Sequence, residues 1–215
     1  MTPSAVLFDC DGVLVDSEPA TFALIQEEFA AHGLHLSIPE LEALFIGGTI
    51  EGVRTIANEM GAGLPEDWVD QYYERLYARL CKGTPLMPGI PELLEILDKS
   101  EIPYAVGSNG RMAKMRATLG QHPEIEAKLE GRLFSGQDLG KPKPAPDLYL
   151  HAAAALGVDP ARCVVIEDSA TGASAGIAAG MRVLGYAPQG PNPRLAATGA
   201  ELFTKMAEVP KLLGL

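Results

Sequence analysis

Residues 5–12 read Ala-Val-Leu-Phe-Asp-Cys-Asp-Gly, four apolar residues that stop at two aspartates and a glycine. A short apolar run with such an end is typical of a buried β-strand. Residues 103–108 (Pro-Tyr-Ala-Val-Gly-Ser) and 163–168 (Cys-Val-Val-Ile-Glu-Asp) repeat the pattern, and both also end on polar side chains. Open parallel sheets bind ligands beyond the carboxyl ends of their strands. The three strand ends are therefore predicted to meet at one crevice.

The rest of the chain divides into a helical region and an alternating region. Apolar periods predict helices over 20–32, 39–46, 50–60 and 65–81, with no convincing strand in that region. Further on, the sequence predicts helices over 91–99, 111–120, 146–156 and 169–179 and strands over 103–107, 132–135, 163–166 and 182–186. We therefore expect an α/β fold, a Rossmann-like, doubly wound parallel sheet built from residues 1–16 and 84–215, with an α-helical cap domain, 17–83, inserted after the first strand.

Composition narrows the class of protein. The chain has 215 residues, of which 47% are hydrophobic and 21% charged, as in an ordinary globular enzyme. Its formal net charge of −11 argues against a nucleic-acid partner, because phosphates favour clustered Lys and Arg. Apolar runs are too short to span a bilayer, and the N-terminus does not resemble a signal peptide. We expect a cytoplasmic protein with neither membrane nor nucleic-acid partners.

Two patterns suggest function but are better explained by packing. Cys10 lies between two aspartates, which would raise the pKa of its thiol and make it a poor nucleophile. Gly172, Gly176 and Gly180 recur evenly along a predicted helix, yet their spacing is not that of a dinucleotide-binding loop. We expect these glycines to let the helix pack closely on the sheet.

The first strand end offers two carboxylates two residues apart. One carboxylate of this pair, Asp9 or Asp11, can act as a nucleophile toward phosphorus, and the other as a general acid for the leaving oxygen. Gly12 permits a tight backbone course beside them. The alternative is a plain turn, since Asp and Gly dominate turns.

The later polar groups complete a possible phosphate and metal site. Ser108 precedes a predicted helix, where it can bind phosphate or simply cap the helix. Lys143 lies in a proline-stiffened loop, and we prefer it as the site lysine over the more solvated Lys141. Glu167 and Asp168 are hard oxygen ligands that favour Mg²⁺, although Asp168 is also suited to cap a helix.

With these residues in place, the chain resembles the haloacid dehalogenase superfamily, and within it the β-phosphoglucomutase-like phosphatases with a helical cap. The resemblance covers the whole chain. It rests on four motifs, which are Phe8-Asp-Cys-Asp-Gly-Val-Leu-Val-Asp-Ser-Glu18, Val106-Gly-Ser-Asn109, Lys143-Pro-Ala-Pro-Asp147 and Val165-Ile-Glu-Asp-Ser169. Together the motifs are specific for the superfamily and weakly informative about the substrate.

The resemblance implies a role for each motif residue. Asp9 would form an aspartyl-phosphate, and Asp11 would protonate the departing alcohol and then activate water. Mg²⁺ would be held by Asp9, the Asp11 carbonyl and Asp168, with Glu167 as an outer partner.

Substrate contacts follow from the same resemblance. Ser108 and the Asn109 N–H would bind phosphate oxygens, and Lys143 would bridge phosphate and Asp9. The segment Gly47-Gly48-Thr49 resembles a cap loop that reaches the site, so we expect Gly47 and Thr49 near the phosphate ester.

Phosphate-monoester hydrolysis is the favoured activity. Asp11 argues against halide displacement, which needs no proton. Mutases of the β-phosphoglucose type carry a cap histidine and arginine where this chain has Thr21 and Ile50, although Arg54 or Arg75 could replace the lost cation. A phosphomutase therefore stays an alternative.

A receiver-like phosphoacceptor signalling module is a second alternative, but receivers are about half this length and lack a lid. The expected partner is a small-molecule phosphate monoester, such as a sugar phosphate, and the family resemblance favours a monomer.

Overall fold

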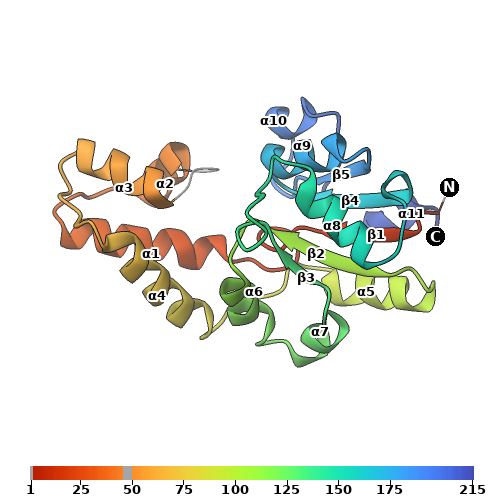
Figure 1. The fold of residues 1–215 in the computed structure, drawn as a ribbon. Helices are drawn as coiled ribbons and strands as arrows, with labels where there is room; N and C mark the ends of the chain where they lie inside the picture. The colour runs from red at the N-terminus through yellow and green to blue at the C-terminus, as the bar shows by residue number, and fades with distance from the viewer. Residues whose placement is uncertain (1, 46–49) are drawn as a thin grey trace. The chain divides into compact units, whose positions relative to one another are not determined.

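The computed structural model describes residues 2–45 and 50–215, and the chain divides into two compact units (Figure 1). One unit, the core, comprises the chain up to Asp16 together with Pro85–Leu215. The other, the cap, is Ser17–Thr84. The predicted phosphate-contacting residues Gly47 and Thr49 lie outside the described residues.

The core is built on a six-stranded sheet in the order β3-β2-β1-β4-β5-β6, in which every neighbouring pair is parallel. The strands are β1 Ala5–Phe8, β2 Tyr104–Ser108, β3 Leu133–Ser135, β4 Cys163–Glu167, β5 Arg182–Tyr186 and β6 Glu201–Phe203. From β1 the chain builds outward to β2 and β3 on one side, then crosses to β4 on the other. The predicted Rossmann-like sheet is confirmed, and its switch point lies between β1 and β4.

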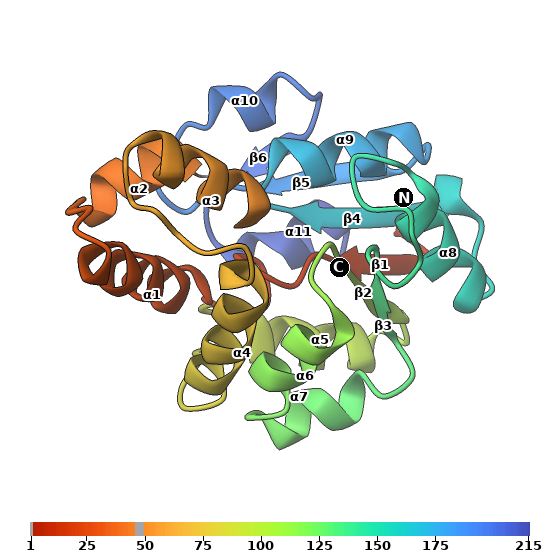
Figure 2. The same ribbon diagram turned by 60° about the vertical axis from the view of Figure 1, so that its left-hand side comes forward.

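Helices cover both faces of the sheet (Figure 2). They are α5 Ile90–Lys99, α6 Met112–Leu119, α7 Pro123–Lys128, α8 Asp147–Ala155, α9 Ala170–Ala178, α10 Pro193–Ala196 and α11 Val209–Leu213. Side chains alternate along β1, so Val6 and Phe8 pack with α5, while Ala5 and Leu7 pack with α8 and α9. All four are fully buried, which explains why the run reads as continuously apolar.

Glycines bring α9 close to the sheet, as predicted. A Cβ atom at Gly176 would lie 2.8 Å from Val183 Cγ2 and 3.2 Å from Val165 Cγ2, too close for a side chain. Gly172 faces a carboxylate instead, since a Cβ there would overlap Glu167 Oε1. Gly176 therefore serves packing, and Gly172 leaves room for Glu167. The expectation for Gly180 was wrong, because it lies beyond the end of α9 at a φ of +75°, with no atom of the described residues other than its chain neighbours within 4 Å of where a Cβ would be, and it serves the turn into β5.

The cap consists of helices wherever its regular elements are described, over residues 17–45 and 50–84. They are α1 Glu18–Ala31, α2 Ile38–Phe45, α3 Ile50–Glu59 and α4 Trp68–Leu80. Phe29, Trp68 and Tyr72 form a buried aromatic cluster at the centre of the cap's own hydrophobic core. The helix expected to start at Pro65 begins at Trp68, after a turn in which the Trp68 N–H donates to the Pro65 carbonyl (3.2 Å).

The chain leaves and re-enters the core at one place. The Asp16 N–H donates to the Pro85 carbonyl (2.9 Å), the Met87 N–H donates to the Leu14 carbonyl (2.9 Å), and Val15 forms an antiparallel bridge with Leu86. The two linker segments therefore run side by side. Among the described residues, none of the helices combines the length and the apolar character needed to cross a membrane.

Candidate active site

The end of β1 places Asp9 at the centre of the sheet edge. Its N–H continues the ladder by donating to the Ile166 carbonyl (2.9 Å), and the residue is 8% exposed. Gly12 then turns the chain with a φ of +77°, a conformation that favours glycine. A Cβ at Gly12 would lie 2.0 Å from Asp168 Oδ2, so the missing side chain also makes room for the Asp168 carboxylate.

Lys143 joins β1 to β4 through two carboxylates. Its Nζ lies 2.5 Å from Asp9 Oδ1 and 2.6 Å from Glu167 Oε1, and the lysine side chain is 3% exposed. Lys141 lies on the surface, with its Nζ 3.9 Å from Asp147 Oδ1. Of the two candidate lysines, Lys143 is the one that the structure brings against Asp9.

Glu167 is fully buried, and both of its oxygens accept hydrogen bonds. Besides Lys143, Oε1 accepts from the Tyr149 hydroxyl (2.8 Å). Oε2 accepts from the Ser169 hydroxyl (2.9 Å) and from the Ser169 N–H (3.2 Å). The Tyr149 ring also lies 4.8 Å from the Lys143 ammonium. Tyr149 and Ser169 thus hold the Glu167 carboxylate in place, and that carboxylate in turn fixes the position of the Lys143 ammonium.

Three carboxylates gather where a metal ion is expected. Asp9, Glu167 and Asp168 each offer an oxygen, and these oxygens lie within 4.8 Å of one another. Three carboxylates around one ammonium leave an excess of negative charge, and hard oxygen donors suit Mg²⁺. The donor set fits the ion. Because Glu167 is already occupied by Lys143, Tyr149 and Ser169, the geometry favours Asp9 and Asp168 as direct ligands, with Glu167 behind them.

Burial dominates the electrostatics of this cluster. It raises the pKa of Asp9 from 3.8 to about 7, against the opposing effect of Lys143 and with smaller contributions from Glu167 and Asp11. Burial lowers the pKa of Lys143, but Asp9 and Glu167 outweigh it and hold that pKa well above its usual value. Lys143 therefore stays charged. The ionised form of Asp9, which burial disfavours, would be stabilised by any further cation nearby.

Cys10 takes no part in this cluster. Burial, and then the carboxylates of Asp11 and Asp9, raise the pKa of its thiol well above the usual value. The side chain packs in the core beneath the site. The predicted packing role of Cys10 agrees with both observations.

The end of β2 contributes Ser108 and Asn109. Ser108 is buried, and its hydroxyl accepts a hydrogen bond from the Gly110 N–H (2.9 Å). The Asn109 side chain binds the backbone of the lysine loop, since Oδ1 accepts from the Lys143 N–H (2.7 Å) and Nδ2 donates to the Lys143 carbonyl (3.1 Å). Asn109 thus orients Lys143, a role that the sequence did not suggest.

Lys114 is a further charged group at the site that the sequence analysis did not identify. It lies in the first turns of α6, and its Nζ is 2.8 Å from Asp11 Oδ1. The side chains are 18% and 25% exposed, respectively. The only sequence signal is a lysine near the start of the helix that follows Ser108, a common surface pattern.

Changing Tyr149 to phenylalanine tests how much the buried bond to Glu167 matters. We expect Tyr149→Phe to lower the free energy of unfolding by about 1–3 kcal/mol, because a buried carboxylate oxygen loses a donor. Thermal and urea unfolding would measure this loss. Tyr104→Phe is the matched control, since its hydroxyl donates to the partly exposed Asp98 (2.9 Å) away from the site. An equal or smaller loss in Tyr149→Phe would contradict the expectation.

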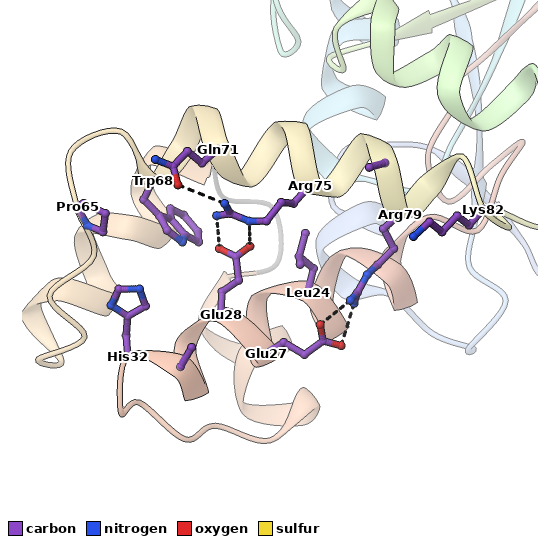
Figure 3. A pocket seen from close by; sticks show the side chains of 12 residues that line it. Leu24, Glu27, Glu28, His32, Pro65, Trp68, Gln71, Arg75, Arg79 and Lys82 are labelled. Carbon is purple, nitrogen blue, oxygen red and sulfur yellow. Dashed lines mark hydrogen bonds and ion pairs between the residues drawn. The ribbon is translucent and has the colours of Figure 1, made fainter.

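The cap contains a cavity of about 850 Å³ between α1 and α4, and none of the carboxylates described above lines it (Figure 3). Arg75 crosses it to bind Glu28, with Nε–Oε1 and Nη2–Oε2 distances of 2.5 and 2.9 Å. Arg54 donates to the Pro65 carbonyl (2.8 Å). Both arginines considered as replacement phosphate-binding cations are therefore hydrogen-bonded inside the cap.

Comparison with known proteins agrees with the motifs. The family model "Hydrolase: haloacid dehalogenase-like hydrolase" matches residues 3–180. The 6-phosphogluconate phosphatase of Escherichia coli K12 is 32% identical over 97% of this chain and 93% of its own. Hexitol phosphatase A of the same organism is 32% identical over 88% and 85%. The crystal structure of a HAD family hydrolase from Deinococcus radiodurans R1 with bound phosphate and sodium is 35% identical, with a TM-score of 0.83 over 99% and 96% of the two chains.

Proposed function

This chain belongs to the haloacid dehalogenase-like hydrolases, the family that its four motifs predicted, and we propose that it is a Mg²⁺-dependent phosphatase of small phosphorylated metabolites. The observation that carries the proposal is the pair of contacts made by Lys143, one with Asp9 and one with Glu167. They bring together a nucleophile, a buried cation and an orienting carboxylate from the ends of two strands and from a loop. Phosphoryl transfer needs chiefly such positioning and charge stabilisation.

In the first step Asp9 attacks phosphorus. A bond forms from an Asp9 carboxylate oxygen to phosphorus, the bond to the leaving oxygen breaks, and the Asp11 carboxyl gives its proton to that oxygen to release the alcohol. Lys143 offsets charge on the attacking carboxylate and on the phosphoryl group. Ser108 Oγ and the Asn109 N–H bind phosphoryl oxygens.

In the second step water replaces Asp9. Asp11, now a carboxylate, takes a proton from water as the water oxygen bonds to phosphorus, and the bond to Asp9 breaks to give inorganic phosphate. Asp9, the Asp11 carbonyl and Asp168 would hold Mg²⁺, which when bound offsets negative charge on the transferred group. The overall change consumes one water and leaves the enzyme as it began.

Sugar and sugar-alcohol phosphates are the proposed substrates, because two relatives are phosphatases named for 6-phosphogluconate and hexitol phosphates. We expect a cytoplasmic monomer without membrane or nucleic-acid partners. For the mutase alternative, the described residues considered for a second phosphate grip all have partners within the cap: Thr21 donates to the Ser17 carbonyl (2.9 Å), Arg54 donates to the Pro65 carbonyl (2.8 Å), and Arg75 is paired with Glu28. A receiver-like module does not fit membership of a hydrolase family.

A panel of phosphate monoesters with Mg²⁺ tests the function. We expect steady release of inorganic phosphate from p-nitrophenyl phosphate and faster release from one or more sugar phosphates. Phosphorylation of the protein without turnover would instead support a receiver-like phosphoacceptor module. Conversion of a sugar 1-phosphate to its 6-phosphate without phosphate release would establish a mutase.

Metal removal should separate binding from catalysis. We expect EDTA to abolish phosphate release, and Mg²⁺ at 100 times its dissociation constant to stabilise the metal-free protein by about 2.7 kcal/mol. Asp168→Asn should lose most of that stabilisation, because it removes a carboxylate from the cluster. Asp138→Asn, which removes an exposed carboxylate outside the acidic cluster, should keep the full stabilisation by Mg²⁺. An unchanged Mg²⁺ response in Asp168→Asn would contradict the proposed ligand set.

A further inference from the structure

The two aspartates after β1 are each paired with a different lysine. Asp9 is bound by Lys143 from the loop before α8, and Asp11 by Lys114 from α6. Lys143 also binds Glu167, as part of the buried cluster already described. Lys114 lies outside that cluster, so its contact with Asp11 needs an explanation of its own.

Gly110 shows how closely Lys114 approaches the reacting groups. A Cβ at Gly110 would lie 3.2 Å from Ser108 Oγ, 3.4 Å from Lys114 Cδ and 3.7 Å from Asp11 Oδ2. The lysine stem, the Asp11 carboxylate and the Ser108 hydroxyl therefore all lie near one point beside Gly110, the position that a side chain there would occupy. Ser108 ends β2 and α6 begins four residues later, so a short segment carries both the hydroxyl and the ammonium to the Asp11 carboxylate.

We propose that Lys114 is a positioning residue for the reaction, which holds the Asp11 carboxyl where it can pass its proton to the leaving oxygen. The inference rests on the proposed function, because it assumes that Asp11 is the proton donor. In that step the phosphorus bond to the leaving oxygen breaks, the bond to Asp9 forms, and the Asp11 proton moves to the departing alkoxide to give the alcohol. Orientation matters here because proton transfer needs hydrogen-bond geometry.

Two other roles for Lys114 make different predictions. If Lys114 and Asp11 form only a solvated surface ion pair, the pair contributes about 0–1 kcal/mol to stability and nothing to turnover. A lysine that binds a second anion of the substrate affects only substrates that have one. A lysine that acts through Asp11 lowers kcat/KM only for leaving groups that need a proton, whatever their other charges. The later attack of water, in which Asp11 is the base, follows release of the leaving group and does not enter kcat/KM.

The test compares Lys114→Met with the wild type on two monoesters. One is p-nitrophenyl phosphate, whose leaving group departs without protonation. The other is the alkyl monoester without a second anion that the wild type turns over fastest, for example a hexitol phosphate. The quantity measured is kcat/KM, because it reports the steps up to release of the leaving group.

We expect kcat/KM for the alkyl monoester to fall by about 10–100-fold and that for p-nitrophenyl phosphate by less than about 3-fold, since general acid catalysis contributes about 10²–10⁴-fold where it is needed. In an Asp11→Asn background, Lys114→Met should cause no further loss. Lys114→Arg should recover part of the alkyl activity. Lys128→Met, which removes a lysine paired with Asp98 elsewhere in the core, is the matched control.

Equal losses on both monoesters, or none, would overturn the inference, as would a full additional loss in the Asp11→Asn background. Lys114→Gln is measured in parallel, with thermal unfolding of each variant, in case Lys114→Met does not fold. Failure of the proposed function is seen separately in Asp9→Asn. If that variant keeps its turnover, the function is wrong. If it is inactive while Lys114→Met resembles its control, only the role of Lys114 is wrong.

Discussion

Asp9→Asn should abolish phosphate release, with kcat reduced by about 10⁴-fold or more, as for the loss of other nucleophiles. An amide oxygen is a poor nucleophile, and the variant also loses the carboxylate that Lys143 binds at 2.5 Å. The measurement is inorganic phosphate release from p-nitrophenyl phosphate and from a sugar phosphate with Mg²⁺. Acid-quenched samples of the wild type, but not of the variant, should contain phosphate bound covalently to protein.

The same variant should show a distinct pH dependence of stability. Burial raises the pKa of Asp9 from 3.8 to about 7, so the metal-free folded protein binds more protons than the unfolded chain between those values. Stability of the wild type in EDTA should therefore fall as pH rises through this window, and Asp9→Asn should not share that fall. Asp138→Asn, with an exposed carboxylate, controls for loss of charge. Turnover in Asp9→Asn close to that of the wild type would mean that another residue carries the reaction.

Lys143→Met should cost both activity and stability. Two buried carboxylates, Asp9 and Glu167, lose the ammonium that lies within 2.6 Å of each. Breaking a buried pair in this way typically destabilises a protein by about 3–5 kcal/mol. We also expect kcat to fall by about 10³-fold, because the attacking carboxylate and the phosphoryl group lose a preorganised positive charge. Urea unfolding and phosphate release measure the two effects.

The stability loss in Lys143→Met should shrink as pH is lowered. Without the ammonium, which lowers the pKa of Asp9, that pKa rises further above its value in the unfolded chain. Proton uptake on folding then stabilises the variant at low pH. Lys141→Met is the matched control, because it lies two residues away in the same loop but on the surface. If the two variants behaved alike, the central role of Lys143 would be refuted.

The strand ends were predictable from sequence, but their supporting side chains were not. Asp9, Ser108 and Asp168 follow short apolar runs, and parallel strands bring such ends to one edge. Lys114 and Tyr149 lie on helices, where a lysine or a tyrosine gives no sign of the carboxylate it will meet. The role of the Asn109 side chain was missed because its partner, the Lys143 backbone, lies 34 residues away in sequence.

Short elements near the C-terminus were also missed, for a different reason. Strand β6 has three residues, and two of them are exposed at the sheet edge, so no apolar run marks it. Helices α10 and α11 have four and five residues, too few for a helical period to appear. Helix α7, earlier in the chain, has six residues beginning with Pro123 and the same limitation. Longer elements such as α5, with four buried apolar residues in ten, were predicted nearly to the residue.

The paired linker segments have a consequence for how the chain folds. Strand β1 must find β2 across the whole cap, and the entropy lost in closing a loop grows with its length. The bond between Asp16 and Pro85 holds the two ends of that loop together. A cap that collapses early, from contacts local in sequence, would therefore reduce the loop between β1 and β2 to the two linker segments and α5. The cap, although it separates β1 from β2 in sequence, would then lower the entropy cost of pairing the two strands.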